Sequence, residues 1–387
     1  MTVTRYRRYS TEFKLRLVEA YLAGEGSANG VAKQYGIPRS LVLIWAEKYR
    51  QGELTLDVQR EEQLLEYEQK VAALEAHDRH PYWGPRKLLR LVSQRWPDAS
   101  WPVRSTVARC FQHLGLVTAR RRVRRPGPAG PPLAPMEAPN AVWTTDYQGQ
   151  FKLGDGQYCF PLTVADGYSR MLLACQALTS TKLVEARPIF ERLFRNTASP
   201  DASAPNGVPF ATQALGRLSS LAVWWRRLGI RPDLTEPGSL HQNGRHERMH
   251  LTLKRECTRP PRSGRIQQQR CFDRWRQEYN TLRPHEGLND ATPASVYRPS
   301  PRPYPARLPP LEYPGHYEVR RVSRNGRIRW HKQWVNVSQT LGEEAIRFVE
   351  IDDGEWDVYF GPLRLGRFQE RTLTIEDVLG RQYRRPY

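Results

Sequence analysis

The feature that most limits how this 387-residue chain can fold is a segment that cannot join a packed core. Residues 120 to 139 read "RRRVRRPGPAGPPLAPMEAP", a cluster of arginines followed by a run of proline and glycine. The arginines have no apolar period to bury, and the proline run cannot be helical. We therefore expect an extended linker between separately folded parts, able to track DNA phosphates through its basic residues. These are Arg120, Arg121, Arg122, Arg124 and Arg125.

The residues before this linker have helical periodicity. In residues 1 to 56, apolar positions recur at helical spacing on both sides of the tight turn Gly36-Ile37-Pro38. Helix, short turn and helix predict a helix-turn-helix DNA-binding domain whose later helix carries Arg39, Lys48 and Arg50 on its polar face. A small helical bundle that touches no DNA is the alternative. Residues 57 to 119 predict a connecting helix and a second helix-turn-helix-like unit.

After the linker the pattern changes to short β-like runs. Within residues 140 to 298, "AVWTTDYQGQF", "QYCFPLTVADGYS" and "RMLLACQAL" predict an antiparallel three-strand meander, and helical patterns follow it. Such an order favours an α/β or α+β domain. A proline-rich spacer covers residues 299 to 312. Residues 313 to 387 alternate apolar and polar side chains around the turn Asn325-Gly326, which predicts a small C-terminal antiparallel β-barrel.

Charge and cysteine usage narrow the class of protein. The chain has 60 Lys+Arg against 40 Asp+Glu, a formal net charge of +20, which favours a polyanionic partner over a merely basic soluble protein. Its five cysteines are scattered and contain no C-x-x-C, so they indicate neither a disulfide framework nor a cysteine-rich zinc site. We expect a cytoplasmic protein with no membrane partner, because no apolar run reaches membrane-spanning length.

One short motif, "HERMH", permits two kinds of metal chemistry. His246, Glu247 and His250 match the H-E-x-x-H pattern of zinc proteases, but no clearly framed third ligand follows. Alternatively, Glu247 and Lys254 lie two turns apart on one helix face, where they could hold a metal ion and a DNA phosphate side by side. Asp146 interrupts the apolar run of a predicted central strand, which is costly unless a metal or partner compensates. Asp166 ends the neighbouring strand, where a turn-forming role is equally compatible.

Five ordered motifs in residues 140 to 298 carry a family resemblance: "VWTTDYQGQF", "FPLTVADGYSR", "NGVPFA", "HQNGRHERMHLTLKRE" and "EYNTLRPHEGLNDATPASVY". Together they resemble the integrase-type catalytic core of bacterial insertion-sequence transposases, the DDE group with a ribonuclease H-like α/β fold. The resemblance implies metal-dependent cleavage and transfer of double-stranded DNA, with transposon terminal repeats and target DNA as partners. It also implies a homo-multimer, because two ends must be brought together, and a nucleoid-associated location.

The same resemblance implies three carboxylates holding two Mg²⁺ or Mn²⁺ ions. Asp146 is then the first metal ligand, Glu247 the third, and Lys254 a contact to the DNA backbone. The second carboxylate is missing, because Pro205 occupies its position in "SPDASAPNGVPFA" and no apolar strand leads to it. Asp201 lies too far upstream, so Asp166 is the possible substitute. We expect impaired catalysis, and a catalytically inactive DNA-binding derivative is the alternative.

Overall fold

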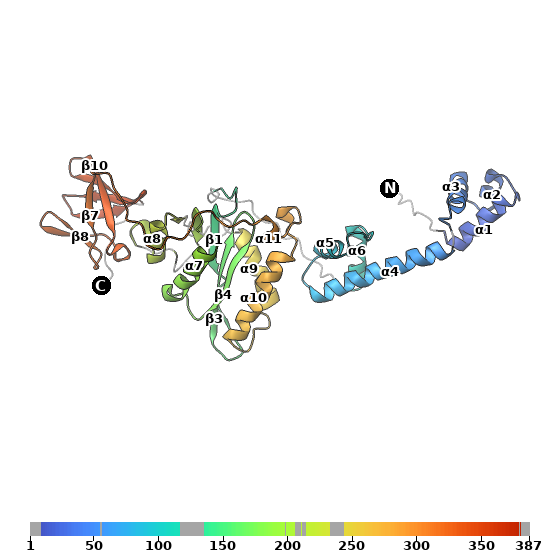
Figure 1. Ribbon diagram of the computed structural model, residues 1–387, viewed down its shortest axis with the longest axis horizontal. Helices are drawn as coiled ribbons and strands as arrows, with labels where there is room; N and C mark the ends of the chain where they lie inside the picture. Colours follow the sequence, from blue (N-terminus) through green and yellow to red (C-terminus); the bar gives the residue numbers. More distant parts are fainter. Residues whose placement is uncertain are drawn as a thin grey trace. The chain divides into compact units, whose positions relative to one another are not determined.

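The computed structural model describes residues 9–54, 56–116, 135–197, 199–205, 210, 214–232, 244–378 and 380 (Figure 1). The chain forms two compact units, Met1–Arg120 and Arg121–Tyr387. The five linker arginines predicted to contact phosphates lie outside the described residues.

The N-terminal unit begins with three short helices, α1 (Thr11–Leu22), α2 (Ala28–Gln34) and α3 (Arg39–Arg50). Ser10 and Ser27 cap the first two, each hydroxyl accepting a backbone N–H at 3.2 Å. Gly36 supplies the left-handed residue, at φ +63°, that allows the tight turn between α2 and α3. Leu17 and Trp45 are buried between the helices. The predicted helix-turn-helix is confirmed.

A long helix and two further helices complete this unit. They are α4 (Leu56–Arg79), α5 (Pro85–Arg95) and α6 (Arg104–His113). Proline at the first position of α5 fits a helix start, where its missing N–H would be unsatisfied in any case. Trp83, Leu88 and Phe111 are buried in one small cluster, so α4, α5 and α6 form a second packed group.

A mixed six-stranded sheet forms the core of the C-terminal unit. Its strands are β1 (Val142–Tyr147), β2 (Phe151–Lys152), β3 (Tyr158–Asp166), β4 (Leu172–Leu178), β5 (Ala202–Pro205) and β6 (Arg231–Pro232). The order is β2-β3-β1-β5-β6, with β4 paired to β3. The predicted meander of β1, β3 and β4 is antiparallel, whereas β5 runs parallel to both β1 and β6. This sheet confirms the integrase-like, ribonuclease H-like core.

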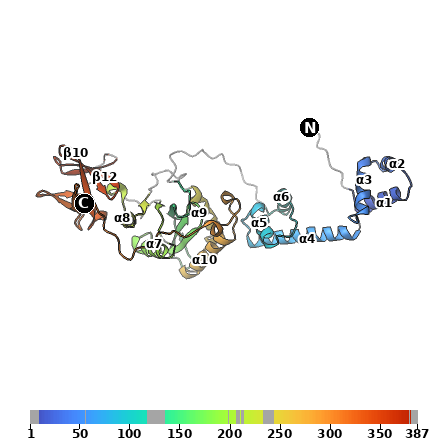
Figure 2. The same ribbon diagram turned by 45° about the horizontal axis from the view of Figure 1, so that its top comes forward.

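Helices cover both faces of this sheet, as Figures 1 and 2 show. Trp143 and Trp225 are buried in the cluster formed with α7 (Leu183–Thr197) and α8 (Ser220–Arg227). On the other face Leu253 and Phe272 are buried in the cluster formed with α9 (Gly244–Cys257) and α10 (Arg265–Thr281). Shorter helices are α11 (Pro293–Val296) and the 3₁₀ turns η1 (Leu215–Arg217), η3 (Glu286–Leu288) and η4 (Gln339–Leu341).

The C-terminal module is an open sheet, and the prediction of a closed β-barrel is wrong. Its strands are β7 (Glu318–Arg321), β8 (Arg327–Trp330), β9 (Gln333–Asn336), β10 (Ala345–Asp352), β11 (Glu355–Phe360), β12 (Leu363–Gln369) and β13 (Thr374–Asp377). Five pair in the order β13-β12-β11-β10-β7, while β8 and β9 form a separate pair. Trp330 of this pair packs on Phe348 and Phe368 of the sheet. The apolar face is thus covered without the two edge strands meeting.

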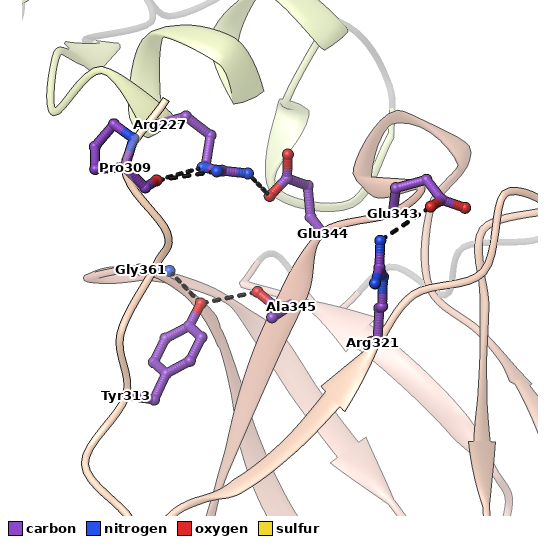
Figure 3. Close-up of polar contacts among 8 residues, drawn as sticks. All are labelled: Arg227, Pro309, Tyr313, Arg321, Glu343, Glu344, Ala345 and Gly361. Carbon is purple, nitrogen blue, oxygen red and sulfur yellow. Dashed lines mark hydrogen bonds and ion pairs between the residues drawn. The ribbon is translucent and has the colours of Figure 1, made fainter. Parts of the chain in front are cut away.

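The module packs directly on the core, and Figure 3 shows the polar contacts of Arg227 at this junction together with contacts inside the module. Arg227, at the end of α8, donates to Glu344 at 2.7 Å and to the Pro309 carbonyl at 2.9 and 3.2 Å. Leu215, Leu218, Ala222 and Val223 of the core are buried in the same apolar cluster as the module. The proline-rich segment therefore runs along a continuous interface.

Candidate active site

Asp146 lies near the end of β1, opposite Thr163 of β3. Its side chain is 18% exposed. Side chains alternate along a strand, so Asp146 shares a sheet face with Thr144, whereas Trp143 and Tyr147 face the opposite side. Thr144 contacts His246 of α9. The Asp146 carboxylate is therefore on the face that α9 covers.

Helix α9 brings the other predicted site residues to this face. His246 and Leu253 are buried against the sheet, while Glu247 and Lys254 are exposed. His250 Nδ1 lies 4.0 Å from Asp146 Oδ2. Glu247 is one turn before His250 and Lys254 one turn after it, so all three are neighbours on the helix surface. Asp146, Glu247 and Lys254 come from two adjoining elements.

The two histidines of the H-E-x-x-H pattern point at threonine hydroxyls. His246 Nε2 and His250 Nε2 both lie 2.7 Å from Thr163 Oγ1, and His246 Nδ1 lies 2.9 Å from Thr144 Oγ1. Burial holds the pKa of His246 well below its ordinary value and lowers the pKa of His250 to about 4, so both rings are neutral at pH 7. Three of the four ring nitrogens are used inside the protein, which disfavours the zinc-protease hypothesis.

Position 205 lies in a strand that the sequence did not predict. Ala202–Pro205 forms β5, and Pro205 is in register with Thr145, one residue before Asp146. A neighbouring strand on each side, β1 and β6, imposes the extended conformation on this weakly β-forming sequence. Proline has no backbone N–H, so position 205 donates no ladder hydrogen bond. Pro205 offers no oxygen ligand, so this backbone position beside β1 contributes no metal-binding side chain.

Asp166 ends β3 and is 1% exposed. Its carboxylate accepts the Asn140 N–H at 2.7 Å, the Ser169 N–H at 2.8 Å and the Ser169 hydroxyl at 2.5 Å. Burial raises its pKa, although these hydrogen bonds act in the opposite direction. It pairs with Trp143, three residues along β1 from Asp146, or about 10 Å of strand. These contacts fit the closing of a turn.

The donor set fits one hard cation better than two. Within the described part of the chain, no group of three or more His, Cys, Asp or Glu side chains could hold a metal ion. Mg²⁺ can bind through one or two carboxylates and keep several waters, which Asp146 and Glu247 could support. A second ion would need the carboxylate that Pro205 lacks.

Three further predicted DNA-binding residues belong to the N-terminal unit. Arg39, Lys48 and Arg50 are exposed on α3. Lys48 and Arg50 lie 3.7 and 3.5 Å from Glu53 and Glu47, with all four side chains more than half exposed. Such exposed pairs are weak, so these cations can exchange their carboxylates for phosphates.

Sequence reasoning missed Thr144 and Thr163. Thr163 is fully buried in β3, where its hydroxyl also donates to the Asp146 carbonyl at 2.9 Å. Burying a hydroxyl without a hydrogen-bond partner is costly, so a threonine inside the apolar run "PLTVAD" was the available signal.

Comparisons with known protein families match two separate segments of the chain. An integrase core domain model matches residues 228–293, and a transposase model matches residues 4–77. The first match contains α9 with Glu247 and Lys254, and the second contains the helix-turn-helix.

Individual proteins similar to this chain include two from insertion elements. The chain is 27% identical over 222 residues to the insertion element IS407 uncharacterized 31.7 kDa protein of Burkholderia multivorans, covering 57% of this chain and 76% of that protein. It is 25% identical over 223 residues to the insertion element IS476 uncharacterized 39.2 kDa protein of Xanthomonas euvesicatoria, covering 56% and 60%. The HTLV-2 integrase catalytic core domain in complex with magnesium aligns at 13% identity and a TM-score of 0.31, over 42% of this chain and 99% of that one.

The described helices include no membrane-spanning helix. None of them combines the length and the apolar character that crossing a membrane requires.

Proposed function

We propose that this chain, an insertion-sequence transposase with an integrase-type core, binds the terminal repeats of its element and transfers their ends to target DNA through a site built on Asp146 and Glu247. The observation that carries the proposal is the contact of α9 with β1, where His250 lies 4.0 Å from Asp146 and one helical turn from Glu247. The family matches supply the reaction class.

In the proposed site the protein residues have separate tasks. Asp146 and Glu247 would hold a divalent cation, Mg²⁺ or Mn²⁺, which when bound activates the attacking oxygen and neutralises charge at phosphorus. Lys254, exposed one turn beyond His250, would contact the backbone phosphate. Asp166 would hold the turn after β3 through Asn140 and Ser169.

DNA recognition would come from the N-terminal unit. The exposed face of α3, with Arg39, Lys48 and Arg50, would enter a major groove, as later helices of helix-turn-helix domains do. The arginines at 120–125 would track phosphates between the two units. Because two element ends must meet before they are joined, we further propose that the active species is a homo-multimer.

Pro205 favours a second function, that of an inactive DNA-binding derivative. With one of three carboxylates absent, the negative charge that develops at phosphorus is poorly neutralised. Such a protein would still occupy element ends through its helix-turn-helix.

A strand-transfer assay separates these functions. The protein as it stands would be compared with Pro205→Asp and with Pro205→Asn, which matches Asp in size and lacks the charge, using labelled element-end DNA in Mg²⁺ and in Mn²⁺. We expect joined product from the Asp variant and little from the other two. Equal product from all three would mean that another group completes the metal site. Absence of product from all three, with end DNA bound, would contradict the proposed catalytic site.

A further inference from the structure

We propose that His246 and His250 are positioning residues that clamp α9 to the sheet through Thr163 and so set Glu247 relative to Asp146. The inference rests on the proposed function, because it concerns the same two carboxylates. It also accounts for the H-E-x-x-H pattern, whose imidazoles the proposed reaction does not otherwise use.

The centre of the clamp is the Thr163 hydroxyl. It has one proton and two lone pairs. The proton is donated to the Asp146 carbonyl at 2.9 Å. His246 Nε2 and His250 Nε2, each 2.7 Å away, must therefore both donate to the two lone pairs. All three hydrogen-bonding positions of the Thr163 hydroxyl are filled, two by histidines of α9 and one by the Asp146 carbonyl of β1.

The second nitrogen of His246 extends the clamp to β1. With Nε2 protonated in a neutral ring, Nδ1 is an acceptor, and the Thr144 hydroxyl donates to it at 2.9 Å. The Ala165 carbonyl, 3.2 Å from the same hydroxyl, is the competing acceptor for its single proton, and the shorter contact is the one to Nδ1. One imidazole therefore connects α9 to two strands, and the ring is 2% exposed. Rotating it would break both hydrogen bonds in a buried setting, where each is expensive to lose.

His250 lies beside the carboxylate without a hydrogen bond to it, because the one N–H of its neutral ring is at Nε2. Its ring meets that of His246 edge to face, with centroids 4.6 Å apart, so the two rings brace each other. Its Nδ1 lies 4.0 Å from Asp146 Oδ2. Its backbone carbonyl accepts the Gln148 amide at 3.3 Å, two residues beyond Asp146. The helix turn that carries Glu247 is thus tied to the chain on both sides of Asp146.

The geometry matters because the other contacts of α9 with the sheet are less directional. Met249 and Leu253 supply apolar packing, which is non-directional and specifies orientation less sharply than hydrogen bonds do. A misplacement of about 1 Å can cost on the order of 100-fold in rate. We therefore expect the hydrogen bonds of the clamp to fix the position of Glu247 more closely than apolar burial of α9 would.

The chain offers a matched pair of substitutions to test this. Thr163→Val removes the central hydroxyl and keeps the side-chain shape. Thr145→Val makes the same change in the adjacent strand, at a fully buried hydroxyl that has no hydrogen-bond partner among the described residues. The full-length proteins would be titrated with Mn²⁺ alone, following the free ion by electron paramagnetic resonance. Strand transfer would be measured in the Pro205→Asp background to separate kcat from KM.

We expect Thr163→Val to weaken Mn²⁺ binding by about tenfold or more, the scale of losing a residue that orients metal ligands. It should lower kcat and leave KM for DNA unchanged, whereas Thr145→Val should change neither. His250→Gln, whose amide can replace the Nε2 donor, should retain more Mn²⁺ affinity than His250→Ala. If Thr163→Val does not fold, the comparison of His250→Gln with His250→Ala tests the clamp instead.

Two outcomes separate failure of this inference from failure of the proposed function. If Asp146→Asn weakens Mn²⁺ binding while Thr163→Val behaves like Thr145→Val, the carboxylate site stands and the clamp is overturned. If Asp146→Asn leaves Mn²⁺ binding unchanged, the proposed metal site itself is wrong, and the clamp falls with it.

Discussion

Replacing Asp166 tests whether this carboxylate closes a turn or replaces the missing metal ligand. Asp166→Ala would leave two buried backbone N–H groups, those of Asn140 and Ser169, without an acceptor. The Ser169 hydroxyl can turn to another acceptor, but the backbone donors cannot. At about 1 to 3 kcal/mol for each buried unsatisfied donor, the gross loss is about 2 to 6 kcal/mol. The desolvation of the carboxylate offsets part of it, so we expect a net loss of about 2 to 4 kcal/mol.

The assay is urea unfolding followed by tryptophan fluorescence, together with Mn²⁺ titration of the folded variants. Asp166→Asn keeps one acceptor and should lose about half as much stability as Asp166→Ala. Ser169→Ala serves as the control for the hydroxyl, because it removes the donor to Asp166 at 2.5 Å and the acceptor of the Met171 N–H at 3.2 Å and keeps the carboxylate. Neither Asp166 variant should change Mn²⁺ affinity. A variant of Asp166 that keeps full stability and loses Mn²⁺ binding would refute this reasoning and make Asp166 a metal ligand.

Three further predictions concern other parts of the chain. Arg227→Ala should destabilise the C-terminal unit by about 1 to 3 kcal/mol in urea unfolding, because it leaves the partly buried Glu344 carboxylate unpaired. Arg321→Ala, in the more exposed ion pair of Figure 3, should cost less than about 1 kcal/mol. Equal losses of stability in the two variants would contradict this prediction. A hydrogen bond from the Cys257 thiol and the nearby Arg262 lower the pKa of Cys271. At pH 7, iodoacetamide should therefore label Cys271 before Cys257, as followed by mass spectrometry. Labelling of Cys257 first would contradict the assignment of the thiolate to Cys271. Lys48→Ala should weaken binding to all DNA sequences alike and reduce the slope of log affinity against log salt by about 1; an unchanged slope would mean that Lys48 contacts no phosphate.

Local signals in the sequence were sufficient for much of the fold. Apolar spacing and the turn at Gly36 identified the helix-turn-helix, because both act over a few residues. The strands around "LGDGQ" were found for the same reason. The open edge of the C-terminal sheet was not, since closure depends on whether β7 and β13 meet, and no local pattern records that.

The site was predictable in its elements and less so in its contacts. Asp146 on a strand and Glu247 on a helix follow from local patterns. The state of Asp166 depends on Asn140, 26 residues earlier in the chain. The direction of the His246 and His250 rings depends on which strand passes beneath α9, about 100 residues apart in sequence. A five-residue motif cannot distinguish a metal ligand from a hydrogen-bond donor when that strand is unknown.

Position 205 depends both on its local sequence and on strands that lie far from it in the chain. Its sequence context, "DASAP", argued against a strand, yet β1 and β6 hold Ala202–Pro205 in the sheet through backbone pairing that no side chain dictates. The backbone beside Asp146 therefore keeps its course without the carboxylate. Because β5 forms with proline at position 205, we expect Pro205→Asp to need no rearrangement of the sheet. Its effect, or its absence, will then report on the chemistry of the site and not on the fold.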